Sequence, residues 1–168
     1  STYHVEYLPI HGGSLRVFVS KHRQPDETVQ QMLAAEANTV NSLAYYQAFA
    51  QRVDQLKQET RSLLQGLKAQ GERIVAYGAS AKGATLLNYF GIGADLLDYV
   101  ADRSTFKQGH YTPGIHLPIY APEKLLEDQP DYVLLLVWNF AEEVLEQQQA
   151  YREAGGKFIV PIPSLTVI

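Results

Sequence analysis

The chain has 168 residues, 46% of them hydrophobic and 19% charged, which suits a globular domain with a core and excludes wholesale disorder. Its formal net charge of −4 argues against a nucleic-acid binder, which usually displays a basic stripe. It has no cysteine, which excludes a disulfide framework, a thiolate zinc site and a cysteine nucleophile and fits a cytoplasmic protein. No apolar run is long enough to span a bilayer, so no membrane partner is expected.

The N-terminal residues predict a β-hairpin. Residues 5–8 and 15–19 are β-prone, and they flank the turn-rich stretch PIHGGS at 9–14. The chain begins at Ser1 without methionine and already has a strand pattern from residue 2, so we expect a piece of a longer protein. Residues 1–24 are therefore expected to form a hairpin segment that joins a missing upstream part.

A long helical region is predicted for residues 26–70. Asp26 or Thr28 can cap its start, and leucines and aromatic residues recur within it at helical spacing. The pattern is weakest at residues 38–42, where we expect a break, and Gly71 is expected to end the region.

From residue 73 onward the pattern alternates between strands and helices, which predicts a parallel sheet with crossover helices. The predicted strands are 74–77, 97–101, 116–119, 132–137 and 158–162, and the predicted helices are 81–90, 122–127 and 141–154. Residues 132–138 are apolar without alternation, as in a strand buried on both faces. We therefore expect an α/β fold in residues 25–168, a Rossmann-like three-layer parallel sheet that includes the helical region.

The turn after the first of these strands is typical of an anion site. Dinucleotide-binding folds place G-x-G-x-x-G there, and this chain has GASAKG, with Ser80 in the middle glycine's place. Ser80 can cap the following helix or donate its hydroxyl to a phosphate. Lys82 puts a positive charge near the positive end of the helix dipole, which disfavours the helix and favours a bound anion. A plain tight turn with a solvent-facing lysine is the structural alternative.

Other polar residues follow neighbouring strands and are expected at the same edge of the sheet. Asp102 stands about where a dinucleotide fold has its ribose-binding acid, although it could instead pair with Arg103 or Lys107. Trp138 could stack on a base or belong to the core. Asn139 could bond a phosphate or a base, or cap the helix that starts at 141.

The five histidines show no metal-binding spacing. His11 is the one with a candidate role, because Gly12 and Gly13 beside it allow a ligand or another domain to approach closely. No metal and no catalytic residue is predicted in this chain.

Several short segments stand in series along the chain: HGGSLR at 11–16, YGASAKG at 77–83, LLNY at 86–89, DR at 102–103, KQG at 107–109, PG at 113–114, VWNF at 137–140 and GGKFIVP at 155–161. Together they resemble the C-terminal domain of SAM-dependent sugar C-methyltransferases, and the resemblance covers nearly the whole chain.

This resemblance implies a substrate-binding domain, inactive alone, in an enzyme that methylates C3 of a nucleotide-linked 4-keto sugar. The missing upstream part would hold zinc, SAM and the catalytic base, and no cofactor is expected in this chain. The implied partners are the nucleotide-diphosphate sugar and the upstream SAM-binding domain. The implied substrate-binding residues are Gly78, Ser80, Lys82, Arg103 and Asn139.

Two other functions stay open from the sequence. The first is an NAD(P)-binding Rossmann domain of an oxidoreductase, which Gly78, Gly83 and Asp102 favour. The second is a structural or dimerisation module built on the helical region, which an exposed apolar stripe would support.

Overall fold

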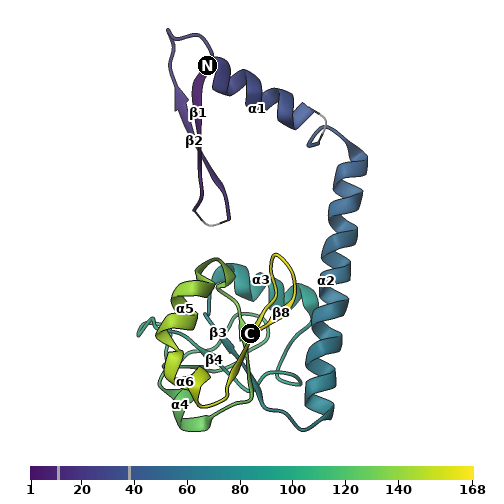
Figure 1. The fold of residues 1–168 in the computed structure, drawn as a ribbon, viewed down its shortest axis with the longest axis vertical. Coiled ribbons are helices and arrows are strands. Elements are labelled where there is room, and N and C mark those ends of the chain that lie inside the picture. Colours follow the sequence, from purple (N-terminus) through teal and green to yellow (C-terminus); the bar gives the residue numbers. More distant parts are fainter. Residues whose placement is uncertain (11, 38) are drawn as a thin grey trace. The chain divides into compact units, whose positions relative to one another are not determined.

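The computed structural model describes residues 1–10, 12–37 and 39–168. It divides into two compact units, Ser1–Val53 and Asp54–Ile168, and helix α2 (Leu43–Ala69) contributes to both (Figure 1). The domain boundary predicted between residues 24 and 25 stays a prediction. Within the described ranges, no helix is both long enough and apolar enough to cross a membrane.

The first unit contains the predicted hairpin and a helix packed against it. Its elements are β1 (Thr2–Leu8), β2 (Ser14–Val19), α1 (Glu27–Ala37) and the first part of α2. The two strands pair antiparallel, and α1 contacts β1. Asp26 caps α1, because its Oδ1 accepts the backbone N–H of Thr28 at 3.0 Å. Hydrogen bonds from Thr28 and from His4 of β1 lower the pKa of the Asp26 carboxyl and fasten the helix to the hairpin.

The second unit contains a six-stranded sheet with helices on both faces. Its elements are β3 (Ile74–Tyr77), α3 (Ala81–Phe90), β4 (Val100–Ala101), β5 (Ile119–Tyr120), α4 (Lys124–Asp128), β6 (Tyr132–Leu135), the 3-10 helix η1 (Trp138–Phe140), α5 (Ala141–Gln147), α6 (Gln149–Glu153), β7 (Lys157–Val160) and β8 (Thr166–Val167). The strand order is β5-β4-β3-β6-β7-β8, and all neighbours are parallel except β7 and β8. This is the Rossmann strand order, so the predicted fold class is confirmed.

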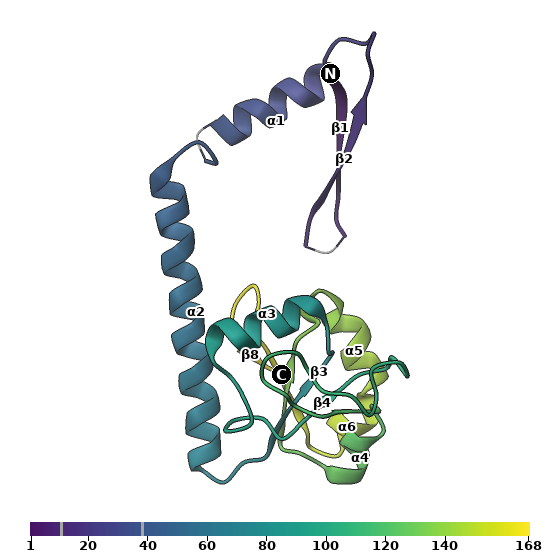
Figure 2. The ribbon, with the colours of Figure 1, turned by 180° about the vertical axis from the view of Figure 1, so that it is seen from behind.

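The sheet is buried on both faces. Alternate residues of β3 and β6, among them Val75 and Leu135, pack with Leu125 of α4, Val144 of α5 and Tyr151 of α6. The intervening strand residues point the opposite way, towards α3 and the C-terminal part of α2. Figures 1 and 2 show these two helical layers on the two sides of the sheet. The double burial predicted for residues 132–138 is confirmed from Val133 to Leu136.

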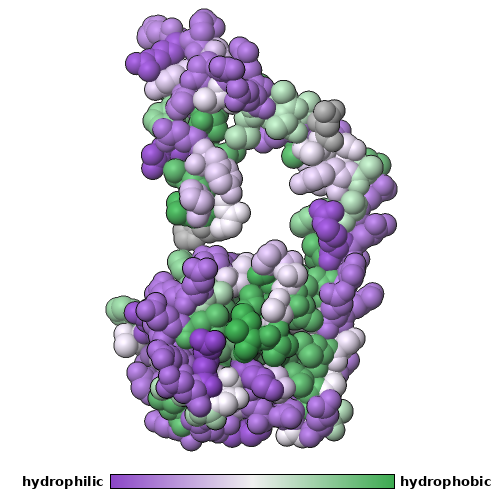
Figure 3. Space-filling model, in the orientation of Figure 1, coloured by the Kyte–Doolittle hydropathy of each residue, from purple (hydrophilic) through white to green (hydrophobic). Residues whose placement is uncertain are grey.

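Some strands and helices begin or end at other residues than predicted. The strand predicted at 116–119 begins only at Ile119, because His116 adopts φ 54°, which no strand accommodates. The helix predicted at 141–154 is interrupted at Gln148. Strand β8 was not predicted. Figure 3 shows apolar residues gathered on the face where β8 lies, and Val167 there is 44% exposed.

Candidate functional site

The carboxyl ends of three neighbouring strands meet at the turn after β3. Strand β3 lies between β4 and β6, so the chain reverses its direction across the sheet here. Ligands of open parallel sheets bind at such a reversal. The predicted site residues all lie at this edge: Gly78, Ser80 and Lys82 after β3, Arg103 after β4, and Asn139 after β6.

Glycine is required at position 78 for two reasons. Its φ of 95° is in the left-handed region that L side chains rarely adopt. A Cβ placed there would stand 2.6 Å from Cγ1 of Val137. The turn after β3 therefore passes directly against Val137, the second residue after β6.

Ser80 caps helix α3. Its backbone is extended, and its Oγ accepts the N–H of Gly83 at 3.1 Å. Gly83 also lets α3 approach the sheet, because a Cβ on it would lie 2.8 Å from Cβ of Leu136. Within the described part of the chain, the backbone N–H groups of Ala81 and Lys82 have no hydrogen-bond acceptor. They are the open donors of this helix end.

The Lys82 ammonium contacts two residues of η1, Trp138 and Asn139. Its Nζ lies 4.5 Å from the centroid of the Trp138 ring and donates a hydrogen bond to Oδ1 of Asn139. Partial burial lowers the pKa of Lys82. Across residues 1–10, 12–37 and 39–168, no carboxylate forms an ion pair with Lys82. The structure thus brings Lys82 and Asn139, two of the predicted site residues, into contact.

Asp102 fixes the shape of the turn, a role that sequence reasoning missed. One carboxylate oxygen accepts the N–H of Ala79 at 2.7 Å and the Lys107 ammonium at 3.3 Å. The other accepts the N–H of Ser104 at 2.8 Å. The residue is only 8% exposed. Of the two ion-pair partners considered from the sequence, Lys107 is the one observed, and the carboxylate is committed to holding its own protein.

Arg103 is directed away from Lys82. Its Nη1 lies 3.2 Å from Oε1 of Glu143 and 3.1 Å from Oε1 of Gln147, both on α5. These groups line a shallow pocket of about 250 Å³ together with Tyr77, whose pKa is raised by burial. Arg103 shares the sheet edge with the other predicted residues but does not contact them.

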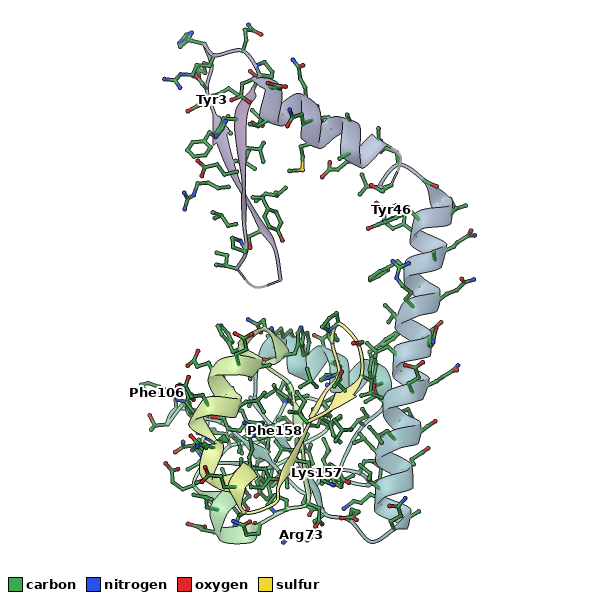
Figure 4. The ribbon with its side chains drawn as sticks, in the orientation of Figure 1. Tyr3, Tyr46, Arg73, Phe106, Lys157 and Phe158 are labelled. Atoms are coloured by element: carbon green, nitrogen blue, oxygen red, sulfur yellow. The ribbon has the colours of Figure 1, made fainter. Side chains whose placement is uncertain are left out.

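An apolar pocket of about 310 Å³ opens on the other side of the turn. Ala79, Ser80 and Ala81 form one wall of it, and Leu136 lies at its base. Phe106, in the loop between β4 and β5, contributes a ring that is 91% exposed and projects from the body of the unit (Figure 4). This pocket was not predicted, because the loop residues that line it carry no recognisable spacing.

His11, the histidine with a candidate role, lies outside the described residues. Among the residues that are described, no group of three or more His, Asp or Glu side chains is placed to hold a metal ion.

Two comparisons with known proteins show which family the chain resembles. Residues 9–163 match the family model described as the C-methyltransferase C-terminal domain. The chain is 37% identical over 168 residues to C-methyltransferase NovU of Streptomyces niveus, with 98% of this chain and 40% of that protein covered. The chain therefore spans about two-fifths of the length of the curated relative it matches.

Proposed function

Because this chain belongs to the family of C-methyltransferase C-terminal domains, we propose that it binds the diphosphate of a nucleotide-linked keto sugar during methyl transfer. The observation that carries this proposal is the N-terminal end of α3. This end has two open N–H groups and the positive end of the helix dipole, its second residue is Lys82, and no acid of the described chain forms an ion pair with the Lys82 ammonium.

Trp138 and Asn139 keep the Lys82 ammonium in place for the anion. The ring and the amide restrict the side chain before a ligand arrives, so less side-chain entropy is lost on binding. Burial without a neutralising acid also makes the site favour a negative ligand. Ser80 contributes by capping the helix that presents the two N–H groups.

Arg103, which pairs with Glu143 of α5 in the structure, would add a second charge if a phosphate replaced that carboxylate. Its ion pair with Glu143 is exposed, and exposed pairs contribute little to stability, so a phosphate oxygen can replace the carboxylate at low cost. A planar guanidinium then offers paired donors to the diphosphate.

The bond-making groups belong to the rest of the enzyme, which we place upstream of this chain. SAM, when bound there, supplies the methyl group. The residues of this chain do not fit SAM, because Asp102, which stands where a ribose-binding acid would be expected, is engaged inside the protein. They do not fit zinc either, since thiolates are absent from the sequence and the described residues gather no cluster of ligands. Removal of a proton next to the ketone would give an enolate. This domain would hold the sugar in position for that step.

Calorimetric titration of the chain with dTDP tests this function, using Lys82→Ala and the matched control Lys157→Ala. Lys157 lies 5.5 Å from the Tyr132 ring, so its removal deletes the same charge and a similar ring contact at the amino end of β7. We expect Lys82→Ala to weaken dTDP binding about 10- to 100-fold, because a charge-assisted hydrogen bond is lost, and Lys157→Ala to leave it unchanged. Equal affinity in both variants would remove Lys82 from the site.

The pH dependence of the same titration gives a second readout. Lys82 is charged below its pKa, which burial lowers from 10.5. Affinity for dTDP should therefore be constant in the neutral range and fall as the pH rises, with the loss beginning at a lower pH than for a fully solvated lysine. Lys82→Ala should show no such fall.

A second role, self-association, is favoured by one observation on α2. Leu43, Tyr46 and Phe49 follow one another at helical spacing and are 72%, 51% and 53% exposed. Such a stripe is typical of a contact surface.

A further inference from the structure

Resting on the proposed function, we infer that Asn88 is a positioning residue of the ligand site, because it fastens the loop between β4 and β5 to helix α3. Residues 106, 107 and 110–113 of this loop face Ser80 and Ala81 across the apolar pocket beside the turn. A ligand held by its phosphates at the N-terminal end of α3 would therefore lie next to the loop. The placement of the loop then determines what the rest of such a ligand meets.

The Asn88 side chain joins the last turn of α3 to the loop. Its Nδ2 donates to the carbonyl oxygen of Ala84 at 2.8 Å, one turn earlier in the helix, and to that of Pro113 in the loop at 3.1 Å. The first bond fixes the direction of the side chain, and the second holds the loop. A side-chain amide has two N–H groups, so these two bonds use all of its donors.

Gly114 allows the loop to lie directly on this amide. Its φ of 85° is in the left-handed region that L side chains rarely adopt. A Cβ placed there would stand 2.8 Å from Cγ of Asn88 and would also overlap its Oδ1. The proline and glycine at 113–114 thus both contact the same side chain of α3, one through its carbonyl oxygen and the other through its bare Cα.

The tip of the loop is attached to α3 through this contact. Thr112 and Leu117 are 3% and 1% exposed and anchor the two ends of a turn whose tip is residues 113–116. The N–H of His116 donates to the carbonyl oxygen of Thr112 at 3.1 Å and closes the turn. In the part of the chain that the structure describes, no hydrogen bond other than that from Asn88 joins residues 112–117 to α3. Loss of the Asn88 amide should therefore free the tip while both ends stay in place.

The two ends of α3 thus have separate tasks. The first turn offers the open N–H groups and Lys82, whereas the last turn holds the loop through Asn88. A variant at position 88 should therefore leave the phosphate contacts unchanged. A ligand larger than its phosphates would then have to order the loop itself, and that ordering lowers the affinity.

Calorimetry on the full chain with dTDP and with inorganic pyrophosphate tests this inference. We expect Asn88→Ala to weaken dTDP binding about fivefold, which corresponds to one hydrogen bond, and to leave pyrophosphate binding unchanged. The control is Thr85→Ala. Thr85 is another exposed residue of α3, and its Oγ1 bonds the carbonyl oxygen of Ala81 at 3.1 Å, one turn earlier in the helix. This variant should change neither affinity.

Gly114→Ala and its matched control Gly109→Ala test the contact from the side of the loop. Gly109 has φ 78° in the same loop, but a Cβ there would meet nothing within 4 Å. Gly114→Ala should weaken dTDP binding about fivefold and accelerate hydrogen exchange of the His116 amide about tenfold, and Gly109→Ala should do neither. In the Asn88→Ala background, Gly114→Ala should have no further effect on either quantity.

The outcomes separate this inference from the proposed function. If pyrophosphate binds but both Asn88→Ala and Gly114→Ala keep the affinity for dTDP, Asn88 is not a positioning residue and the diphosphate site stands. If Asn88→Ala weakens both ligands equally, its role is structural and the inference is wrong. If the unsubstituted chain binds neither ligand, the proposed function fails, and the role of Asn88 in binding fails with it. Because Asn88 is exposed, its loss is not expected to affect folding.

Discussion

The substitution Gly78→Ala measures how closely the turn after β3 approaches the end of β6. A φ of 95° costs an alanine about 1–2 kcal/mol, and the new Cβ would meet Cγ1 of Val137 at 2.6 Å, far inside van der Waals contact. Overpacking of this kind costs about 1–3 kcal/mol. We therefore expect Gly78→Ala to lower the free energy of unfolding by about 2–5 kcal/mol, a large share of the stability of an ordinary domain.

Gly71→Ala is the matched control for the backbone part of this cost. Gly71 has φ 87° at the end of α2, and a Cβ there would meet nothing within 4 Å. Urea unfolding followed by the fluorescence of Trp138, the single tryptophan, gives both values. The amount by which Gly78→Ala lowers the free energy of unfolding beyond Gly71→Ala is the steric part of the cost. It should shrink in the Val137→Ala background, as a double-mutant cycle would reveal. If Gly78→Ala costs no more than Gly71→Ala, the close contact between the turn and Val137 does not determine the residue at position 78.

Two further predictions concern the turn and α2. Asp102→Asn should lower the free energy of unfolding by about 2–4 kcal/mol in urea, because an amide cannot accept all three hydrogen bonds and leaves a buried donor unmatched. The control is Asp131→Asn, because the exposed Asp131 side chain accepts one backbone N–H. This substitution should lower the free energy of unfolding by less than Asp102→Asn does. Equal losses would contradict the role given to Asp102. Self-association through α2 should appear in light scattering as a mass above 18.8 kDa that Phe49→Ser reduces, and a monomer at high concentration would exclude it.

The sequence predicted those parts of the fold that local patterns determine. Helix α3 was predicted with its observed bounds, Ala81–Phe90, because a capping serine precedes it and Gly91 at φ 65° ends it. Strand β8 has only two residues and pairs antiparallel at the sheet edge, so no periodicity could reveal it. The alternation of strands and helices predicted a parallel sheet with crossover helices, whereas the strand order and the register were not predicted and come from the structure.

The candidate site was predicted as a set of residues but not as a set of contacts. The chain order placed Lys82 and Asn139 at one edge, yet nothing in the sequence distinguished their hydrogen bond from the separate pairing of Arg103 with α5. Such pairings depend on side-chain direction at distances of a few ångströms, whereas strand order fixes only which edge a residue occupies. The pocket beside Phe106 was not predicted, because the loop that forms it has no repeating sequence pattern.

Asp102 distinguishes this Rossmann-like unit from a dinucleotide-binding one. In the dinucleotide fingerprint, the acid after the second strand is available to ribose hydroxyls. Here the residue at that position, Asp102, is 8% exposed. Its carboxylate accepts hydrogen bonds from Ala79, Ser104 and Lys107, and these bonds stabilise the turn. Ser80 meanwhile replaces the middle glycine and caps α3. The acid that would bind ribose in an NAD(P) site is thus hydrogen-bonded within the protein. Lys82 adds a positive charge, which suits a phosphate. The engagement of Asp102 therefore weighs against an NAD(P) ligand, and the nucleotide-sugar diphosphate remains the proposed one.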